Sequence, residues 1–342
     1  MIYAIIKRRG GKMNLKRASL VIVLIAIFIV CFQSMNNKYD PLARYKYTSE
    51  LTNEQRDKIL EHMDSDDIDF MIQQKLKPDQ YLKYIDVEDF SVKNTLYYEL
   101  CSKMQPADIN YIVYFINKYK SDFNYADLKT ILASYSYANL EEFYNGAYTY
   151  VKEAKLVSEP SSMDVQIKAS ETLYKYIPKD LVTIDNTTIP IASLTGSETI
   201  QIKAEVVESL KKMCADLGAT NNKTCGGLIL TKGYVSYEDQ VKVYENALVN
   251  YGYDDFSKYE DFPGQSEHQL GYSLTFTIAS MDAEQMADSD QVKWLKENAK
   301  KYGFVIRYPE TQETKTGKKY QPLTLRYIGK NNKNYNFDFL NF

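Results

Sequence analysis

Apolar residues follow three different patterns along the chain. Residues 18–32 are apolar apart from one serine. Between residues 52 and 155, apolar and tyrosine positions recur three and four apart, which is the period of a helix that buries one face. Beyond residue 158, helical stretches alternate with short segments in which apolar and polar residues alternate, as in strands. The patterns therefore predict an apolar segment, a helical module and a mixed domain, in that order.

The apolar segment is predicted to be a single membrane anchor. About 20 uncharged residues can cross the hydrocarbon core of a bilayer, and residues 18–37 contain no charge. Six lysines and arginines precede them without an acidic residue, so the positive-inside rule places residues 1–17 in the cytoplasm and the C-terminal domains outside the cell. A cleaved signal peptide is the alternative, although no small-x-small cleavage site follows. Translation could begin at Met1 or at Met13 with the same topology.

The second part, residues 38–157, is expected to be an all-helical module rich in tyrosine. A capping box, TNEQ at residues 52–55, precedes its first apolar pattern, and similar starts precede later ones. The whole chain has 31 tyrosines. They could pack the module while their hydroxyls stay hydrated, or they could form a surface for a partner or a glycan. The turn-forming stretch VSEPSSMD, residues 157–164, marks the predicted boundary of the C-terminal domain, residues 158–342.

The C-terminal domain is expected to have an α+β fold. Three segments have a helical period: residues 200–218, 236–252 and 292–303. Four others are typical of strands: residues 227–234, 271–280, 304–308 and 323–329. Helices and short strands in this order predict a small antiparallel sheet flanked by helices.

Composition and charge exclude several classes of function. A hydrophobic fraction of 44% and a charged fraction of 25% are typical of globular proteins. The chain has 42 lysines and arginines against 45 acidic residues, and six of the cations lie before the apolar segment. The remainder is therefore acidic and has no general attraction for nucleic acid or for an anionic polymer.

Four cysteines are too few for a disulfide scaffold. Cys214 and Cys225 lie on either side of a loop between a predicted helix and a predicted strand, and a bridge could persist in an oxidising compartment. The sequence leaves open whether they are bridged. Neither cysteine belongs to a CxxC motif or to a Cys/His metal pattern.

Five segments of the C-terminal domain carry motifs whose order and spacing belong together. They are YIPKDLVTID (176–185), LTKGYVSYEDQ (230–240), FPGQSEHQLGYSLT (262–275), WLKENAKKYGFVIRYPE (294–310) and YQPLTLRYIG (320–329). Read together, these segments resemble the VanY-type D-alanyl-D-alanine carboxypeptidases of Gram-positive cell walls. The resemblance implies the fold of a zinc peptidase that acts on peptidoglycan.

In that family, an SxHxxGxAxD motif supplies two zinc ligands, His and Asp. A later ExWHxRY-like stretch supplies a general-base Glu and a third ligand, His, and the Arg of a GYRS turn holds the substrate carboxylate. Three protein ligands leave one zinc position for a water molecule, whose pKa the metal lowers. By resemblance, His268 matches the first ligand. Thr275 and Thr324 stand at the other two ligand positions, Gln321 stands at the base and Val235 stands at the arginine.

These replacements lead us to expect no zinc, no other cofactor and no enzymatic activity, that is, a pseudoenzyme of the family. Neutral hydroxyls are weak ligands compared with carboxylate, imidazole or thiolate. Ser266 lies near His268, but no partner acid for a Ser-His nucleophile can be identified. Together with Val235, three residues are expected to line a substrate-like pocket: Gln240, Ser266 and Tyr320.

The expected function is therefore that of a membrane-anchored, extracytoplasmic cell-wall protein. Its carboxypeptidase-like domain would bind peptidoglycan stem peptides or a cell-surface protein and act as a scaffold. The alternative is an active zinc D-alanyl-D-alanine carboxypeptidase that trims stem peptides, and zinc would be a cofactor only in that case. Metal content and release of D-alanine separate the two hypotheses.

Overall fold

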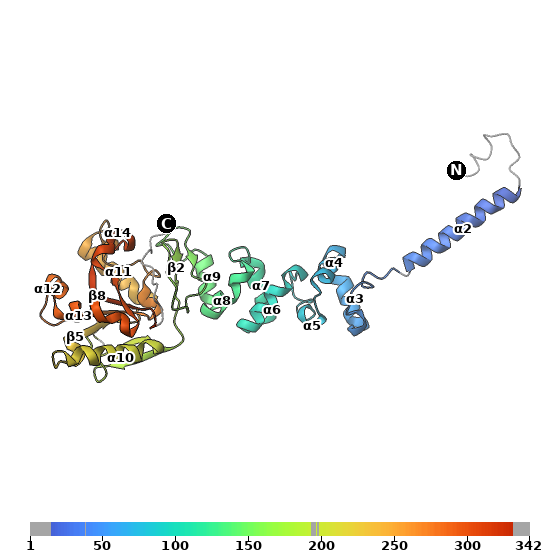
Figure 1. Cartoon of the computed structure of the whole chain (residues 1–342). Helices are drawn as coiled ribbons and strands as arrows, with labels where there is room; N and C mark the ends of the chain where they lie inside the picture. The colour runs from blue at the N-terminus through green and yellow to red at the C-terminus, as the bar shows by residue number, and fades with distance from the viewer. Residues whose placement is uncertain (1–14, 38, 193–195, 197, 331–342) are drawn as a thin grey trace. The chain divides into compact units, whose positions relative to one another are not determined.

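The computed structural model describes residues 15–37, 39–192, 196 and 198–330 (Figure 1). Contacts between residues divide the chain into two compact units. Unit 1 comprises Met1–Ser102 and Ala107–Lys118, and unit 2 comprises Lys103–Pro106 and Tyr119–Phe342. This division falls earlier than the boundary expected after residue 157.

Unit 1 is helical. Its elements are α2 (Leu15–Asn37), η1 (Thr48–Glu50), α3 (Asn53–His62), α4 (Ser65–Gln74), α5 (Pro78–Tyr81), η2 (Val92–Asn94), α6 (Thr95–Met104) and α7 (Ile109–Tyr119), of which the last two cross the boundary between the units. The Thr52 side chain accepts from the backbone of Gln55, and Gln55 caps in return, which confirms the predicted capping box. Among the residues that the structure describes, none of the helices is long and apolar enough to cross a membrane. The anchor expected over residues 18–37 stays a prediction.

The tyrosines of unit 1 include several that form its core. Tyr45 and Tyr81 are buried with apolar neighbours, among them Leu42, Ile59 and Met71. The Tyr45 hydroxyl donates to the Leu76 carbonyl oxygen at 2.7 Å, so the ring is buried while its polar atom is satisfied. These side chains follow the packing alternative, with a buried rather than a hydrated hydroxyl.

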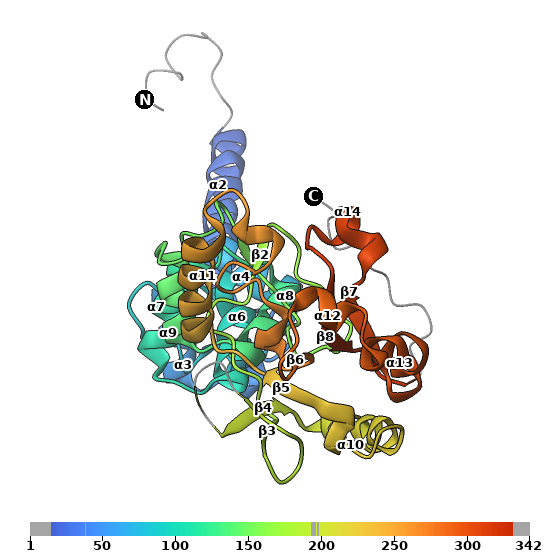
Figure 2. The same cartoon turned by 90° about the vertical axis from the view of Figure 1, so that its left-hand side faces the viewer.

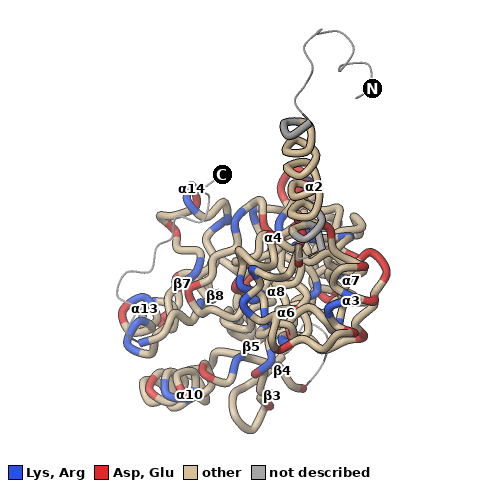
Figure 3. Tube along the Cα trace, turned by 90° about the vertical axis from the view of Figure 1, so that its right-hand side faces the viewer, with Lys and Arg blue, Asp and Glu red and all other residues tan. Residues whose placement is uncertain are grey.

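Unit 2 has the predicted mixed fold. Its helices are α8 (Tyr125–Ser134), α9 (Tyr137–Tyr144), α10 (Ala204–Ala219), α11 (Tyr237–Tyr251), α12 (Ala283–Ala287), α13 (Asp290–Asn298) and α14 (Glu313–Thr316), with short helices η3 (Thr224–Gly227), η4 (Phe256–Lys258), η5 (Glu267–Leu270), η6 (Ala299–Tyr302) and η7 (Glu310–Gln312). Its strands are β1 (Lys155–Leu156), β2 (Glu171–Thr172), β3 (Leu181–Asp185), β4 (Thr199–Lys203), β5 (Leu228–Lys232), β6 (Ser273–Ile278), β7 (Phe304–Tyr308) and β8 (Gln321–Tyr327). Helices α10 and α13 each carry both acidic and basic side chains (Figure 3).

The main sheet of unit 2 has four antiparallel strands in the order β5-β6-β8-β7 (Figure 2). This confirms the small antiparallel sheet. The hairpin β3-β4 and the short parallel pair β1-β2 were not predicted. In the main sheet, Lys232 of β5 lies opposite Thr275 of β6, which in turn lies opposite Thr324 of β8. The register therefore places three polar residues side by side across the sheet.

Tyrosines explain why residues 119–157 belong to unit 2. Tyr148, Tyr174 and Tyr237 form a buried aromatic cluster that joins three distant segments. The Tyr148 hydroxyl donates to the Pro263 carbonyl oxygen at 3.1 Å. Phe143 of α9 also packs against this cluster, so α9 is held to the later segments of unit 2.

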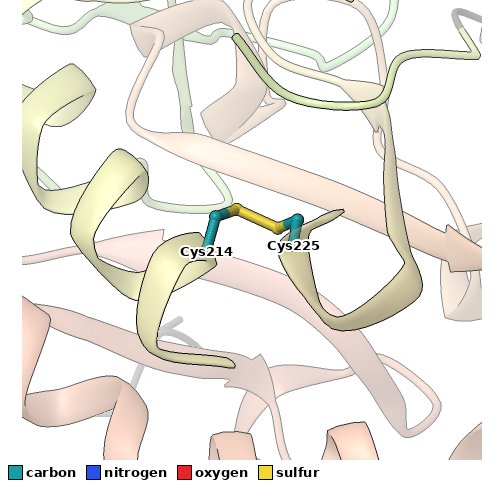
Figure 4. The surroundings of a disulfide bond; sticks show 2 residues. All are labelled: Cys214 and Cys225. Atoms are coloured by element: carbon teal, nitrogen blue, oxygen red, sulfur yellow. A yellow bond between two sulfur atoms is a disulfide. The ribbon is translucent and has the colours of Figure 1, made fainter. Parts of the chain in front are cut away.

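A disulfide joins Cys214, near the end of α10, to Cys225 in η3 (Figure 4). Both cysteines are buried. The bond ties the end of α10 to the segment that leads directly into β5. It therefore fixes the start of a strand whose last residue, Lys232, lies beside the candidate site.

Candidate functional site

Four of the residues predicted from the family motifs form one continuous chain of hydrogen bonds. Oγ1 of Thr275 lies 3.1 Å from Nε2 of His268 and 3.1 Å from Oγ1 of Thr324. The Thr324 hydroxyl lies 3.1 Å from Oε1 of Gln321. Strands β6 and β8 and the short helix η5 therefore bring together positions that are up to 56 residues apart in the sequence.

His268 is fixed at the end of this chain. Its Nδ1 lies 2.8 Å from the Gly233 carbonyl oxygen, which can only accept, so Nδ1 carries the proton and Nε2 accepts from Thr275. Burial, together with the nearby charge of Lys232, lowers the pKa of His268 to about 4. The imidazole is therefore neutral at physiological pH. Gly233 itself lies close to β4, because a Cβ there would be 2.4 Å from the Gln201 carbonyl oxygen.

The hydrogen-bond chain from His268 to Gln321 has three contacts but too few protons to fill all of them. If Nδ1 of His268 is protonated, Nε2 is an acceptor at one end, and Oε1 of Gln321 is an acceptor at the other. Only the hydroxyl protons of Thr275 and Thr324 are then available for the three contacts between them. One contact always lacks a proton. The site consequently has spare acceptor capacity, which suits an incoming N–H or ammonium donor.

Glu267 anchors the short helix that carries His268. Its carboxylate receives two hydrogen bonds from Arg307, at 2.8 Å each, and lies 3.7 Å from Arg326. All three side chains are buried. Burial alone would raise the pKa of Glu267, but the charges of Arg307 and Arg326 outweigh it and hold that pKa below its ordinary value. The sequence pattern did not indicate that the two arginines share this partner.

The structure places the expected pocket residues at different distances from the hydrogen-bond chain. The backbone N–H of Val235 donates to the His268 carbonyl oxygen at 3.3 Å, and Ser266 caps η5 by accepting from the backbone N–H of His268. Gln240 instead donates to the Asp261 carbonyl oxygen at 2.9 Å. The backbone N–H of Tyr320 donates to Glu313, and no hydrogen-bond partner is found for its buried hydroxyl among the described residues. Gln240 and Tyr320 therefore lie outside the chain.

A cleft of about 1000 Å³ adjoins this chain through Thr231 and Gly233. The Thr231 hydroxyl donates to the Thr275 carbonyl oxygen at 3.0 Å, and the Gly233 carbonyl oxygen accepts from Nδ1 of His268. The turn that contains Val235 lines the same cleft, together with Lys232 and Glu260. Sequence reasoning missed the last two residues. A lysine directly before the GYVS turn was the one available signal for Lys232, whereas Glu260 lies in a loop without a motif.

Comparisons with known proteins assign this domain. A family model described as D-alanyl-D-alanine carboxypeptidase, VanY, matches residues 199–330. The Bacillus subtilis protein named "Putative carboxypeptidase YodJ" is 30% identical over 212 residues, which cover 60% of this chain and 74% of the relative. The chain belongs to the VanY family. An Enterococcus faecium D-alanyl-D-alanine carboxypeptidase is also 30% identical over 133 residues, but the match covers 38% of each chain.

Solved structures of carboxypeptidases and of VanYB are similar to part of the chain. The LdcB LD-carboxypeptidase, whose structure is described as revealing the molecular basis of peptidoglycan recognition, is 29% identical. The match covers 54% of this chain and 84% of LdcB, with a TM-score of 0.44. VanYB in complex with D-alanine-D-alanine is 19% identical with a TM-score of 0.38, and the match covers 49% of this chain and 87% of VanYB.

The expectation that this VanY-family chain is not an enzyme is contradicted. It rested on four replaced side chains, whereas the relatives at 30% identity are named carboxypeptidases. None of the comparisons shows that activity has been lost. The chain is therefore a member of an enzyme family.

The side chains at the family's zinc positions do not fit a tetrahedral zinc centre. His268 offers one imidazole nitrogen, but Thr275 and Thr324 offer neutral hydroxyls, and those hydroxyls are hydrogen-bonded to one another. Within residues 15–192 and 198–330, as far as the structure describes them, no group of three or more His, Cys, Asp or Glu side chains could hold a metal ion. The chemistry of the site is that of hydrogen bonds and of the neighbouring Lys232.

Proposed function

We propose that unit 2 acts on peptidoglycan stem peptides, with the C-terminal end of the peptide in the cleft beside His268. One observation carries this proposal: the turn that the family uses for the substrate carboxylate lines a cleft that adjoins the His268 to Gln321 chain. The volume of about 1000 Å³ is sufficient for several amino-acid residues. The names of the relatives, which are carboxypeptidases, support the same substrate class.

The spare acceptor capacity of the site also favours a peptide ligand. A peptide presents an N–H donor and a carbonyl acceptor at every residue. A peptide N–H that enters the site can donate to an acceptor atom of the contact that lacks a proton. Such a donor satisfies a partly buried polar group. Thr275 is only partly buried, so the chain is accessible at its middle.

A binding experiment with the full chain tests this proposal. A synthetic stem pentapeptide that ends in D-Ala-D-Ala is titrated by calorimetry, and its L-Ala-L-Ala isomer serves as the stereochemical control. Released D-alanine is measured in the same samples by mass spectrometry. We expect saturable binding of the D,D-peptide and weaker binding of the isomer. If neither peptide binds at millimolar concentration and no D-alanine is released, the proposed substrate class is wrong.

A pair of matched variants places the ligand in the cleft. Val235→Glu puts a negative charge on the turn that lines the cleft and should abolish binding of an anionic peptide. Val249→Glu makes the same change at a side chain that is 86% exposed on α11 and should leave affinity unchanged. Equal affinities of the two variants would place the peptide elsewhere.

We further propose that the domain works on the outer side of the cell membrane. The charge-free stretch 18–37 and the six preceding cations support this orientation. The disulfide between Cys214 and Cys225 is typical of an oxidising compartment. Protease added to intact wall-stripped cells should degrade unit 2, whereas complete protection until lysis would contradict the orientation.

A further inference from the structure

Lys232 is the least exposed of the lysines that line the cleft. It is the last residue of β5, its side chain is 13% exposed, and its Nζ lies 2.5 Å from Oε1 of Glu260. The Glu260 side chain is 27% exposed and follows the short helix η4. The register of the sheet places Lys232 opposite Thr275. An ammonium group is therefore built into the wall of the cleft, beside the hydrogen-bond chain.

Two other residues that line the cleft are poorer candidates for binding a negatively charged group. Val235, at the family's arginine position, is apolar. Lys242 also lines the cleft, but its side chain is 71% exposed and pairs with Asp239 at 2.8 Å. A solvated lysine contributes little to binding, because water screens its charge and its flexible side chain loses entropy on ordering.

We infer that Lys232 is the residue that binds the C-terminal carboxylate of the ligand, with Glu260 as its counter-ion when the cleft is empty. This inference rests on the proposed function and adds a specificity-determining residue to it. An ammonium group has three N–H donors, so it can bind a carboxylate while it keeps one contact to Glu260. The carboxylates of Glu260 and of the ligand repel one another. Glu260 therefore weakens the binding of a ligand that Lys232 attracts.

The inference predicts opposite effects for the two members of the ion pair. Lys232→Met removes a charge-assisted hydrogen bond and should weaken binding of the free-acid pentapeptide by about 10- to 100-fold. Glu260→Gln removes the competing anion and should tighten binding of the same peptide. If the pair had a purely structural role, both variants would bind the peptide more weakly than the wild type. Lys293→Met, which removes an exposed lysine that pairs with Asp290 and does not line the cleft, is the matched control and should change affinity by less than about twofold.

The ligand provides a second axis for this experiment. A pentapeptide with a C-terminal amide lacks the negative charge, so it should bind the wild-type chain about 10- to 100-fold more weakly than the free acid. Lys232→Met should no longer bind the acid more tightly than the amide. If that variant still discriminates between acid and amide by the wild-type factor, another group binds the carboxylate and the inference is overturned.

The double variant Lys232→Met/Glu260→Gln keeps the test decisive if Lys232→Met fails to fold. It leaves no unpaired charge in the cleft wall, and it should show the same loss of discrimination. Retained discrimination in the folded double variant would overturn the inference. Failure of the proposed function has a different signature, because the wild-type chain would then bind neither the acid nor the amide.

Discussion

Oγ1 of Thr275 and Nε2 of His268 are 3.1 Å apart, in a hydrogen bond that the hydroxyl donates. The first residue is on β6 and the second is in η5, seven positions earlier in the chain. This geometry is close to that of two ligands of one metal ion, yet one of the two groups is a neutral alcohol. The backbone scaffold of a metal site is thus present with side chains that bind each other.

Restoring two side chains should therefore create a zinc site. In Thr275→Asp/Thr324→His, a carboxylate and a second imidazole join His268, which gives three ligands of the kind that zinc prefers. We expect about one zinc per chain by atomic absorption, and an increase in Tm that grows with zinc concentration.

The wild-type chain is the control for this experiment. Two hydroxyls and one imidazole are a weak donor set, so zinc should leave its Tm within error of the metal-free value. The variant Thr275→Asn/Thr324→Gln, which has similar bulk without the ligands, should behave like the wild type. Stoichiometric zinc in the wild-type chain would contradict the donor-set argument.

Unfolding of unit 2 should become easier as the pH falls from about 6.5 to about 4. His268 has an ordinary pKa of 6.5 when unfolded and a pKa of about 4 when folded. In that window the unfolded state binds the proton first, so acid stabilises the unfolded state, and the stability that the neutral imidazole provides is lost progressively.

The variant His268→Gln should lack this part of the pH dependence. It is measured as the free energy of unfolding from urea titrations at several pH values. The chain has one other histidine, His62, whose side chain is 39% exposed in unit 1. In His62→Gln the contribution of His268 stays in place. Identical slopes for His268→Gln and the wild type between pH 4 and 6.5 would refute the assignment.

Local signals in the sequence predicted much of the fold. The capping box at Thr52 marks the start of α3, and alternation of apolar and polar residues predicted β6. Contacts between residues far apart in the sequence were not predicted. The Tyr135 hydroxyl donates to the Val157 carbonyl oxygen at 3.0 Å, and such contacts attach α8 and α9 to unit 2. The hydrogen-bond partner of a tyrosine cannot be read from spacing alone, so spacing did not indicate that α8 and α9 belong to the same compact unit as the later segments.

The candidate site could be predicted only where a motif marks it. The resemblance placed His268, Thr275 and Thr324 in one site. Sheet register brings Thr275 and Thr324 together, and His268 joins them from η5, which lies just before β6 in the chain. Lys232 and Glu260 were missed. They are 28 positions apart, and Glu260 lies in an irregular loop, where neither period nor motif indicates which way a side chain points.

Glu267→Gln should destabilise unit 2 strongly. The carboxylate is buried against Arg307 and Arg326, and removal of one partner leaves buried positive charge without compensation. The expected cost is about 3–5 kcal/mol in the free energy of unfolding. Asp290→Asn, which breaks the exposed pair with Lys293, is the matched control and should cost less than about 1 kcal/mol. A similar cost for both variants would show that the buried cluster does not hold η5 in place.

Replacement of the disulfide should lower stability without changing the ligand's contacts. Cys214 and Cys225 are 11 positions apart, and the bond restricts the unfolded chain between α10 and β5. Cys214→Ser/Cys225→Ser should lose about 2–4 kcal/mol in the free energy of unfolding in urea. Reductant should shift the wild-type transition toward that of the double variant and leave the variant itself unchanged. The bond lies before the start of β5, whereas Lys232 is the last residue of that strand. Below its unfolding transition the variant should therefore still bind the free-acid pentapeptide. Loss of binding by the folded variant would mean that the bond positions the cleft directly.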